Sequence, residues 1–141
     1  PRDDGAAVRR LEQAAAQGYA PAVNDLCTLA FLNKAGLSLE VAMEPAWLSA
    51  GMSGKQSACL YVAAIRALRG IGASPDPDLG VSLLRESAEL GYHYAESDLG
   101  QLYLLGRYVP LDPALGRDWL IRAANDGNKR ARELLQQADL Q

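Results

Sequence analysis

The sequence predicts an all-α fold of stacked helix-turn-helix repeats, an α-solenoid. Four glycines, Gly18, Gly54, Gly91 and Gly127, recur at intervals of 36, 37 and 36 residues. An alanine follows each glycine four residues later, and the apolar residues between them have helical spacing. Self-similarity at a period of about 20 to 50 residues is typical of arrays whose units bury their apolar faces against one another. We therefore expect a curved surface that binds a partner.

The period divides the chain into one domain of five parts. Residues 1–19 form a half repeat that caps the amino end, because 4–18 look like a second helix without its first. Three near-complete repeats follow, at 20–55, 56–92 and 93–128. Residues 129–141 form a charged, Gln-rich cap helix that suits a solvent-facing end.

The third repeat is the most regular. Small and apolar residues from Ala95 to Tyr103 fall on one helical face, and Gly106 is placed to end that helix in a left-handed conformation. A second helix is expected to begin at Asp112 and Pro113, since Asp can cap free amide groups and Pro fits the first turn. It should end at Gly127.

The second repeat has the same chemistry. Its loop, 70–80, matches 106–116 in spacing, and Asp76 followed by Pro77 gives the same helix start. We expect helices at about 57–68 and 77–90.

The first repeat departs from this pattern. Asn33 occupies the place of Gly106, which left-handed backbone tolerates, but Pro45 falls inside the expected second helix. We expect a kink at Pro45. The alternative is a late start after Glu44, which leaves 34–43 as an enlarged loop suited to recognition.

Composition excludes some classes of function. The formal net charge is −3 and the pI is near 5.1, which argues against nucleic-acid binding. The basic pairs Arg9–Arg10 and Lys129–Arg130 are expected to be solvated helix-end charges. No apolar run has the roughly 18 residues of a membrane span. No cleavable leader is recognisable at the start of the sequence. Pro1 is compatible with an exported protein whose signal peptide was removed and with a cytoplasmic protein.

The two cysteines, Cys27 and Cys59, fall inside apolar helical pattern. Two are too few to indicate a disulfide framework, so we expect buried free thiols. A bridge between neighbouring helices is the alternative.

The third repeat resembles the Sel-one-like repeat (SLR), a subclass of the tetratricopeptide superfamily. The resemblance weakens in the first two repeats, where Ala30 and Arg66 take the place of Tyr103 and Trp47 stands one place late relative to Trp119. It implies a right-handed superhelix that acts as an adaptor, inhibitor or scaffold, mostly in bacterial envelopes and secretion or in eukaryotic quality control. The residues that carry it are Ala95, Leu99, Gly100, Leu102, Tyr103, Gly106, Val109, Asp112, Trp119, Leu120, Ala123, Ala124 and Gly127.

By analogy with this superfamily, the first helix of each repeat would line the groove that binds a partner. The positions that follow from the analogy include Asn24, Thr28, Phe31, Leu32, Leu60, Leu68, Tyr94, Ser97, Gln101, Leu104 and Leu105. The apolar members form either a binding strip or ordinary core between the paired helices. The loop residues Arg69, Arg107 and Tyr108 follow the first helices, and they are either contacts for an acidic patch or solubilising side chains.

An enzymatic site is not expected. The sequence has one histidine, His93, in a predicted turn, and its cysteines lack zinc-binding spacing. Residues 51–55 lack both the upstream glycine and the Ser or Thr of a phosphate loop. Some cysteine-rich relatives are linked to β-lactam binding, but those carry a cysteine pair in each repeat.

The resemblance therefore favours a non-enzymatic module that binds a partner protein and needs no cofactor. Within the family it most resembles a bacterial inhibitor or immunity-type protein, for example against a type VI secreted effector. The alternatives are a scaffold or adaptor of an envelope assembly and, outside the binding class, a β-lactam or peptidoglycan enzyme. We expect the bacterial periplasm, with the cytoplasm as alternative. A homodimer stays open.

Overall fold

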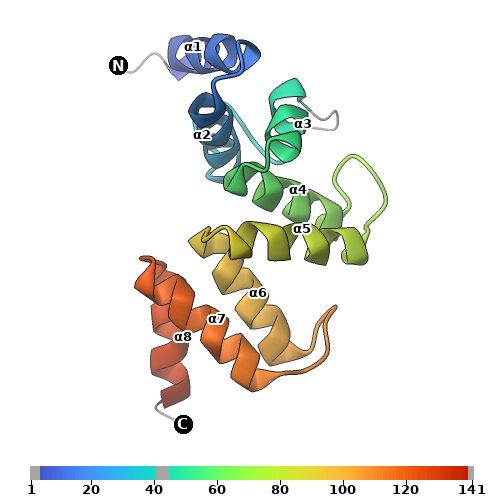
Figure 1. The fold of residues 1–141 in the computed structure, drawn as a ribbon, viewed down its shortest axis with the longest axis vertical. Coiled ribbons are helices and arrows are strands. Elements are labelled where there is room, and N and C mark those ends of the chain that lie inside the picture. The colour runs from blue at the N-terminus through green and yellow to red at the C-terminus, as the bar shows by residue number, and fades with distance from the viewer. Residues whose placement is uncertain (1–3, 41–44, 140–141) are drawn as a thin grey trace.

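The computed structural model describes residues 4–40 and 45–139, and within them the chain is entirely helical. Figure 1 shows the helices following one another along the long axis of an elongated molecule, with the two termini at opposite ends. Their bounds are α1 Asp4–Ala16, α2 Ala20–Phe31, α3 Ala46–Ser53, α4 Ser57–Arg69, α5 Pro77–Glu89, α6 His93–Leu105, α7 Pro113–Asn125 and α8 Lys129–Asp139.

The helices pair as the repeat pattern predicts. Helices α2 and α3, α4 and α5, and α6 and α7 pack as hairpins, while α1 and α8 each pack against the neighbouring hairpin. Contacts between α2 and α4 and between α5 and α6 join successive hairpins. This arrangement confirms an α-solenoid of helical repeats.

The helix ends of the second and third repeats follow the predicted chemistry. The carboxylates of Asp76 and Asp112 each accept a hydrogen bond of 3.1 Å from a backbone amide in the first turn, in α5 and α7 respectively. Gly70 and Gly106 end α4 and α6 with φ values of 75° and 62°, a left-handed conformation that costs glycine little.

The expected kink at Pro45 is wrong. Helix α3 begins at Ala46, and Pro45 precedes it in extended conformation with φ −65° and ψ 147°. Proline lacks the amide proton of an interior helical residue and its ring clashes with the preceding turn, so the helix starts after it. Residues 34–40 are non-helical, as the alternative requires, whereas Glu44 lies outside the described residues.

The expectation of free thiols is also wrong. Cys27 in α2 and Cys59 in α4 form a disulfide with their Cα atoms 5.1 Å apart, and both side chains are fully buried. The pairing follows from the packing of α2 against α4, which brings both cysteines into the same part of the core. The bridge fastens the first repeat to the second.

Helices α6 and α7 cross at two glycines. A Cβ atom built on Gly116 would lie 2.7 Å from the carbonyl oxygen of Gly100, so only glycine permits this approach of the two backbones. One repeat earlier, a Cβ on Gly80 would instead meet the side chain of Leu68. The crossing therefore depends on glycine more strictly in the third repeat than in the second.

Candidate protein-binding surface

The first helices of the repeats, together with α8, line an open pocket of about 290 Å³. Its walls come from α2, α4, α6 and the beginning of α8, so it spans the three repeats and the cap. We call it the aromatic pocket. It is lined by Phe31, Tyr61, His93, Tyr94, Ser97, Asp98, Gly127, Asn128, Lys129 and Arg130.

Three aromatic rings from three helices form one side of this pocket. The ring centroid of Phe31 lies 4.8 Å from that of Tyr61 and 4.8 Å from that of Tyr94, both in edge-to-face geometry. Such pairs are favourable because the positive edge of one ring meets the negative face of the other. The aromatic pocket therefore has a packed apolar side that links consecutive repeats.

A partly buried hydrogen bond holds one of these rings. The Tyr61 hydroxyl donates to the Asp98 carboxylate over 2.6 Å. Burial raises the pKa of Asp98 above its usual range, while the hydrogen bond from Tyr61 acts in the opposite direction. Burial, with the nearby Asp98 charge, also raises the pKa of the Tyr61 hydroxyl, which stays protonated.

His93 has a structural role at the pocket wall. The Asn128 side-chain nitrogen lies 3.1 Å from His93 Nδ1, and the Asn128 side-chain oxygen, Oδ1, accepts a hydrogen bond from the backbone amide of Ala131 at the start of α8. Burial lowers the pKa of His93, against an opposing effect of Asp126. The histidine therefore helps to fix α8 on α6.

Two exposed basic side chains lie beside the aromatic rings. Lys129 and Arg130 are exposed at the start of α8, whereas the negative group of the pocket, Asp98, is half-buried and accepts a hydrogen bond from Tyr61. A ligand with an apolar or aromatic group next to a carboxylate matches this arrangement. The basic pair is thus both a solvated helix end, as expected, and part of the aromatic pocket.

The predicted groove residues do not all lie in this pocket. Phe31, Tyr94 and Ser97 line it, although Ser97 is buried. Leu60 is 1% exposed and belongs to the core, because it is turned toward the α5 side of α4. This placement takes Leu60 out of reach of a partner.

The predicted polar groove residues bond to the chain itself. The Asn24 side-chain oxygen accepts from the Ala58 amide over 3.1 Å and so joins two repeats. The Thr28 hydroxyl donates to the Asn24 carbonyl oxygen, and the Gln101 side-chain amide donates to the Ser97 carbonyl oxygen. All three side chains are half-buried.

The other predicted residues lie at the carboxyl ends of the first helices and in the loops after them. Leu68 and Leu104 pack partly on Gly80 and Gly116 within their own hairpins. This supports the interpretation of Leu68 as hairpin core, whereas Leu104 packs on Gly116 and is also 37% exposed. The residues of this group with exposed side chains are Leu32, Leu104, Leu105, Arg69, Arg107 and Tyr108, among which Arg69 is paired with Glu40 and Arg107 lies over the Tyr108 ring.

Sequence reasoning missed most of the aromatic pocket, including Tyr61, Asp98, Lys129 and Arg130. Arg130 could have been found, because it stands 36 residues after Tyr94, one further period along the chain. Helices α4 and α6 also begin and end 36 residues apart, so the counterpart of Ser97 is Tyr61. A step of 37 residues leads instead to Leu60, and one residue turns a helical side chain by about 100°.

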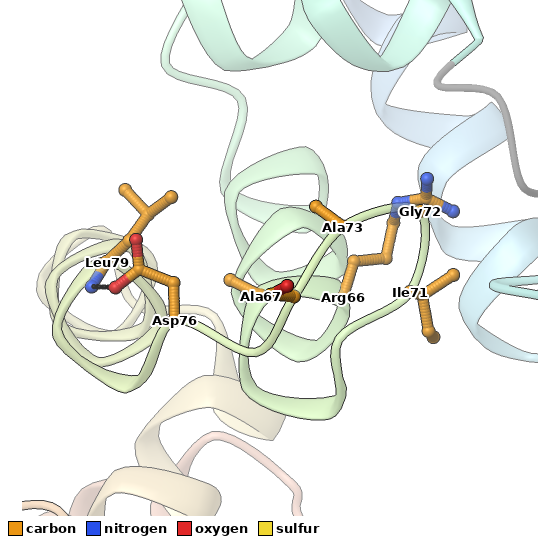
Figure 2. A pocket seen from close by; sticks show the side chains of 8 residues that line it. Arg66, Ala67, Ile71, Gly72, Ala73, Asp76 and Leu79 are labelled. Carbon is orange, nitrogen blue, oxygen red and sulfur yellow. Dashed lines mark hydrogen bonds between the residues drawn. The ribbon is translucent and has the colours of Figure 1, made fainter.

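A second pocket lies under the loop between α4 and α5. This hollow has a volume of about 270 Å³. Figure 2 shows the loop above α4, with Leu79 of α5 on one side and Arg66 of α4 on the other. The Arg66 guanidinium donates to the Leu39 carbonyl oxygen over 2.8 Å, which ties the extended segment of the first repeat to α4. We call this hollow the loop pocket. Its residues are Arg66, Ala67, Ile71, Gly72, Ala73, Ser74, Asp76 and Leu79.

Within residues 4–40 and 45–139, no group of three or more His, Cys, Asp or Glu side chains is placed to hold a metal ion. None of the helices there has the length and apolar character to cross a membrane.

The model of the Sel1 repeat family matches residues 1–19, 56–92 and 93–128, which is more than half of the chain. The chain belongs to the Sel1 repeat family. Sel1 repeat proteins are protein-interaction modules, and this agrees with a packed helical array that offers surface pockets. The match omits 20–55, the repeat in which Pro45 delays the second helix.

Solved structures with Sel1 repeats share the fold. A Sel1 repeat protein from Oxalobacter formigenes is 24% identical, with a TM-score of 0.67 over 84% of this chain and 90% of that one. The protein c5321 displays an SLR fold and is a protective antigen present in uropathogenic Escherichia coli strains. It is 24% identical to this chain, with a TM-score of 0.71. That match covers 89% of this chain but 27% of c5321, so this chain spans about a quarter of that protein. No curated protein matches the sequence.

Proposed function

We propose that this Sel1 repeat protein is a non-enzymatic module that binds a partner protein in the aromatic pocket. The observation that carries the proposal is that the half-buried rings of Phe31 and Tyr94, which pack on the buried Tyr61, lie beside the exposed Lys129 and Arg130. Tyrosine and arginine side chains are enriched where binding energy concentrates. The partner supplies an apolar or aromatic side chain to the rings and a carboxylate to the basic pair.

The partner is proposed to be a bacterial effector that this protein inhibits in the periplasm. The family resemblance suggests the inhibitor or immunity-type role. The Cys27–Cys59 disulfide supports the compartment, because disulfides persist in oxidising environments such as the periplasm and are rare in the cytosol. The inhibitor role and the periplasmic compartment are both proposed for this small repeat array, whose formal net charge is −3.

A charge-reversal pull-down tests the binding site. The protein serves as bait in extracts of the source bacterium, together with the double variant Lys129→Glu/Arg130→Glu. The matched control is Arg9→Glu/Arg10→Glu, because that basic pair is also exposed but lies on α1, away from the pocket. We expect the same stoichiometric partner with the wild type and the control, and its loss with the pocket variant.

The role of the partner is tested by its activity. An inhibitor predicts one partner enzyme whose turnover stops on addition of the wild-type protein and continues with the pocket variant. Capture of several envelope components, without inhibition of any, would favour the scaffold alternative. Equal capture by the pocket variant and the wild type would overturn the aromatic pocket as the site, and nitrocefin hydrolysis above background would overturn the non-enzymatic assignment.

A further inference from the structure

Exposed apolar side chains gather on one edge of the molecule. Six of the ten large apolar side chains that are exposed among the described residues belong to the loop ends of the second and third hairpins. Leu105 is 71% exposed and Leu111 is 64% exposed. Concentration of apolar surface in one place marks an interaction site, whereas single exposed leucines need no explanation. We call these residues the apolar edge: Leu79, Leu104, Leu105, Tyr108, Leu111 and Leu115.

The two loops on this edge share one backbone conformation. Asp76 and Asp112 donate their amides to the equivalent carbonyl oxygens of Ala67 and Tyr103, over 2.8 and 3.0 Å. Gly72 and Tyr108, which are equivalent positions, have φ values of 79° and 60°. The side chains that each loop places over its hairpin can therefore be compared directly.

The loop pocket exists because the second loop carries smaller side chains. In the third repeat Val109 is 9% exposed and covers its hairpin, whereas the equivalent Ala73 is exposed and lines the loop pocket. Gly72 likewise replaces Tyr108. The second loop thus leaves open an apolar position that the third loop fills with its own valine.

We propose that the protein forms a two-fold symmetric dimer in which Leu111 of each copy enters the loop pocket of the other. The pocket walls include Ala67, Ile71 and Leu79, which suit an aliphatic side chain. Leu111 is the exposed aliphatic residue of the neighbouring loop. Burial of this side chain restores in the second repeat the apolar contact that Val109 makes in the third.

The position of the loops fits this symmetry. Both project from the same side of the molecule, at the right of Figure 1, one repeat apart along the long axis. A two-fold axis between them, perpendicular to the rod, places the third loop of each copy over the second loop of the other. The contact is then isologous and closed, so it forms a dimer and not a filament.

Charges on the two loops are complementary. Asp78 is exposed beside the loop pocket in the first turn of α5, and its equivalent in the third repeat is the uncharged Ala114. Arg107 is exposed on the third loop, where the second has Ile71. The proposed axis brings Arg107 of one copy toward Asp78 of the other. The charges therefore favour the contact of a third loop with a second loop over the contact of two like loops.

The first test is the mass in solution. Sedimentation equilibrium of the wild type at increasing concentration should show the 15.1 kDa chain shifting to twice that mass. Leu111→Asp and the pocket-filling Ala73→Leu should each weaken association at least tenfold. Leu90→Asp is the matched control, since Leu90 is comparably exposed at the far end of α5, and it should dimerise like the wild type. Circular dichroism checks that each variant is folded.

The second test identifies the contact. Arg107→Asp and Asp78→Arg should each weaken the dimer, and the double variant that combines them should restore it, because the charges are exchanged across the axis. A wild type that stays monomeric, or a dimer unaffected by both Leu111→Asp and Ala73→Leu, would overturn the proposal. A double variant that dimerises more weakly than either single variant would also overturn the proposal. The dimer goes beyond the proposed function and leaves the aromatic pocket free. Sedimentation therefore tests the dimer alone, and the pull-down tests the aromatic pocket alone.

Discussion

The Tyr61 hydroxyl of α4 and the Asp98 carboxylate of α6, 37 residues apart, form a 2.6 Å hydrogen bond between successive units. Helices α4 and α6 begin and end 36 residues apart, so Tyr61 bonds to the residue that follows its own counterpart, Ser97. The bond joins the second repeat to the third beside the aromatic pocket.

Tyr61→Phe should reduce the free energy of unfolding by about 1 to 3 kcal/mol, because it leaves a buried carboxylate without its donor. The pKa of Asp98 should rise further, since the hydrogen bond acts to lower it. Urea unfolding at neutral pH measures the loss. Tyr108→Phe is the control, because that hydroxyl is at the exposed apolar edge, and equal stability of both variants would contradict the role of the bond.

The free energy of unfolding should fall as the pH rises toward the raised pKa of Glu96. This side chain is 3% exposed, and burial followed by the neighbouring Asp126 raises its pKa from 4.5 to about 7, against a lowering by Arg122. Between these values the folded state holds a proton that the unfolded state has released, so the free energy of unfolding decreases with increasing pH. Glu96→Gln should flatten this slope in urea titrations between pH 4.5 and 7. The exposed Glu89→Gln should not, and an unchanged slope in Glu96→Gln would count against the raised pKa.

Loss of the disulfide should cost about 2 to 4 kcal/mol, because the bridge closes a loop between residues 32 apart and restricts the unfolded chain. The Cys27→Ala/Cys59→Ala variant and the reduced wild type should unfold at similarly lower urea concentrations. Thiol titration of the denatured, unreduced protein should find no reactive thiol. Two reactive thiols there would show that the bridge is absent.

Gly116→Ala should destabilise the protein by about 1 to 3 kcal/mol, because the added methyl group meets the backbone oxygen of Gly100. Gly80→Ala should have a smaller effect. Its methyl group meets first the flexible Leu68 side chain, and alanine gains about 1 kcal/mol over glycine in a helix. Thermal unfolding of the two variants compares them, and equal losses would refute the distinction between backbone and side-chain obstruction.

Much of the fold could be predicted because repeats display their rules several times. The caps at Asp76 and Asp112 and the left-handed Gly106 were each expected from local chemistry and are confirmed. Local rules failed where the choice lay between two compatible outcomes. Pro45 is compatible with a kinked helix and with a late one, and the structure has the late start at Ala46.

The candidate site was less predictable because it depends on how helices rotate against one another. The repeat period gives the step from one unit to the next. An error of one residue in that step rotates the predicted helix face, so that Leu60 is assigned to the surface and Tyr61 is overlooked. The pairing of Cys27 with Cys59 depends in the same way on which faces of α2 and α4 meet.

The bridge from α2 to α4 encloses α3 in a covalent ring, whereas no cross-link among the described residues restrains α7 and α8. Repeat arrays open locally, unit by unit. Lys129 and Arg130 therefore lie on a helix that should exchange its amide protons sooner than α3, and a bound partner would slow that exchange.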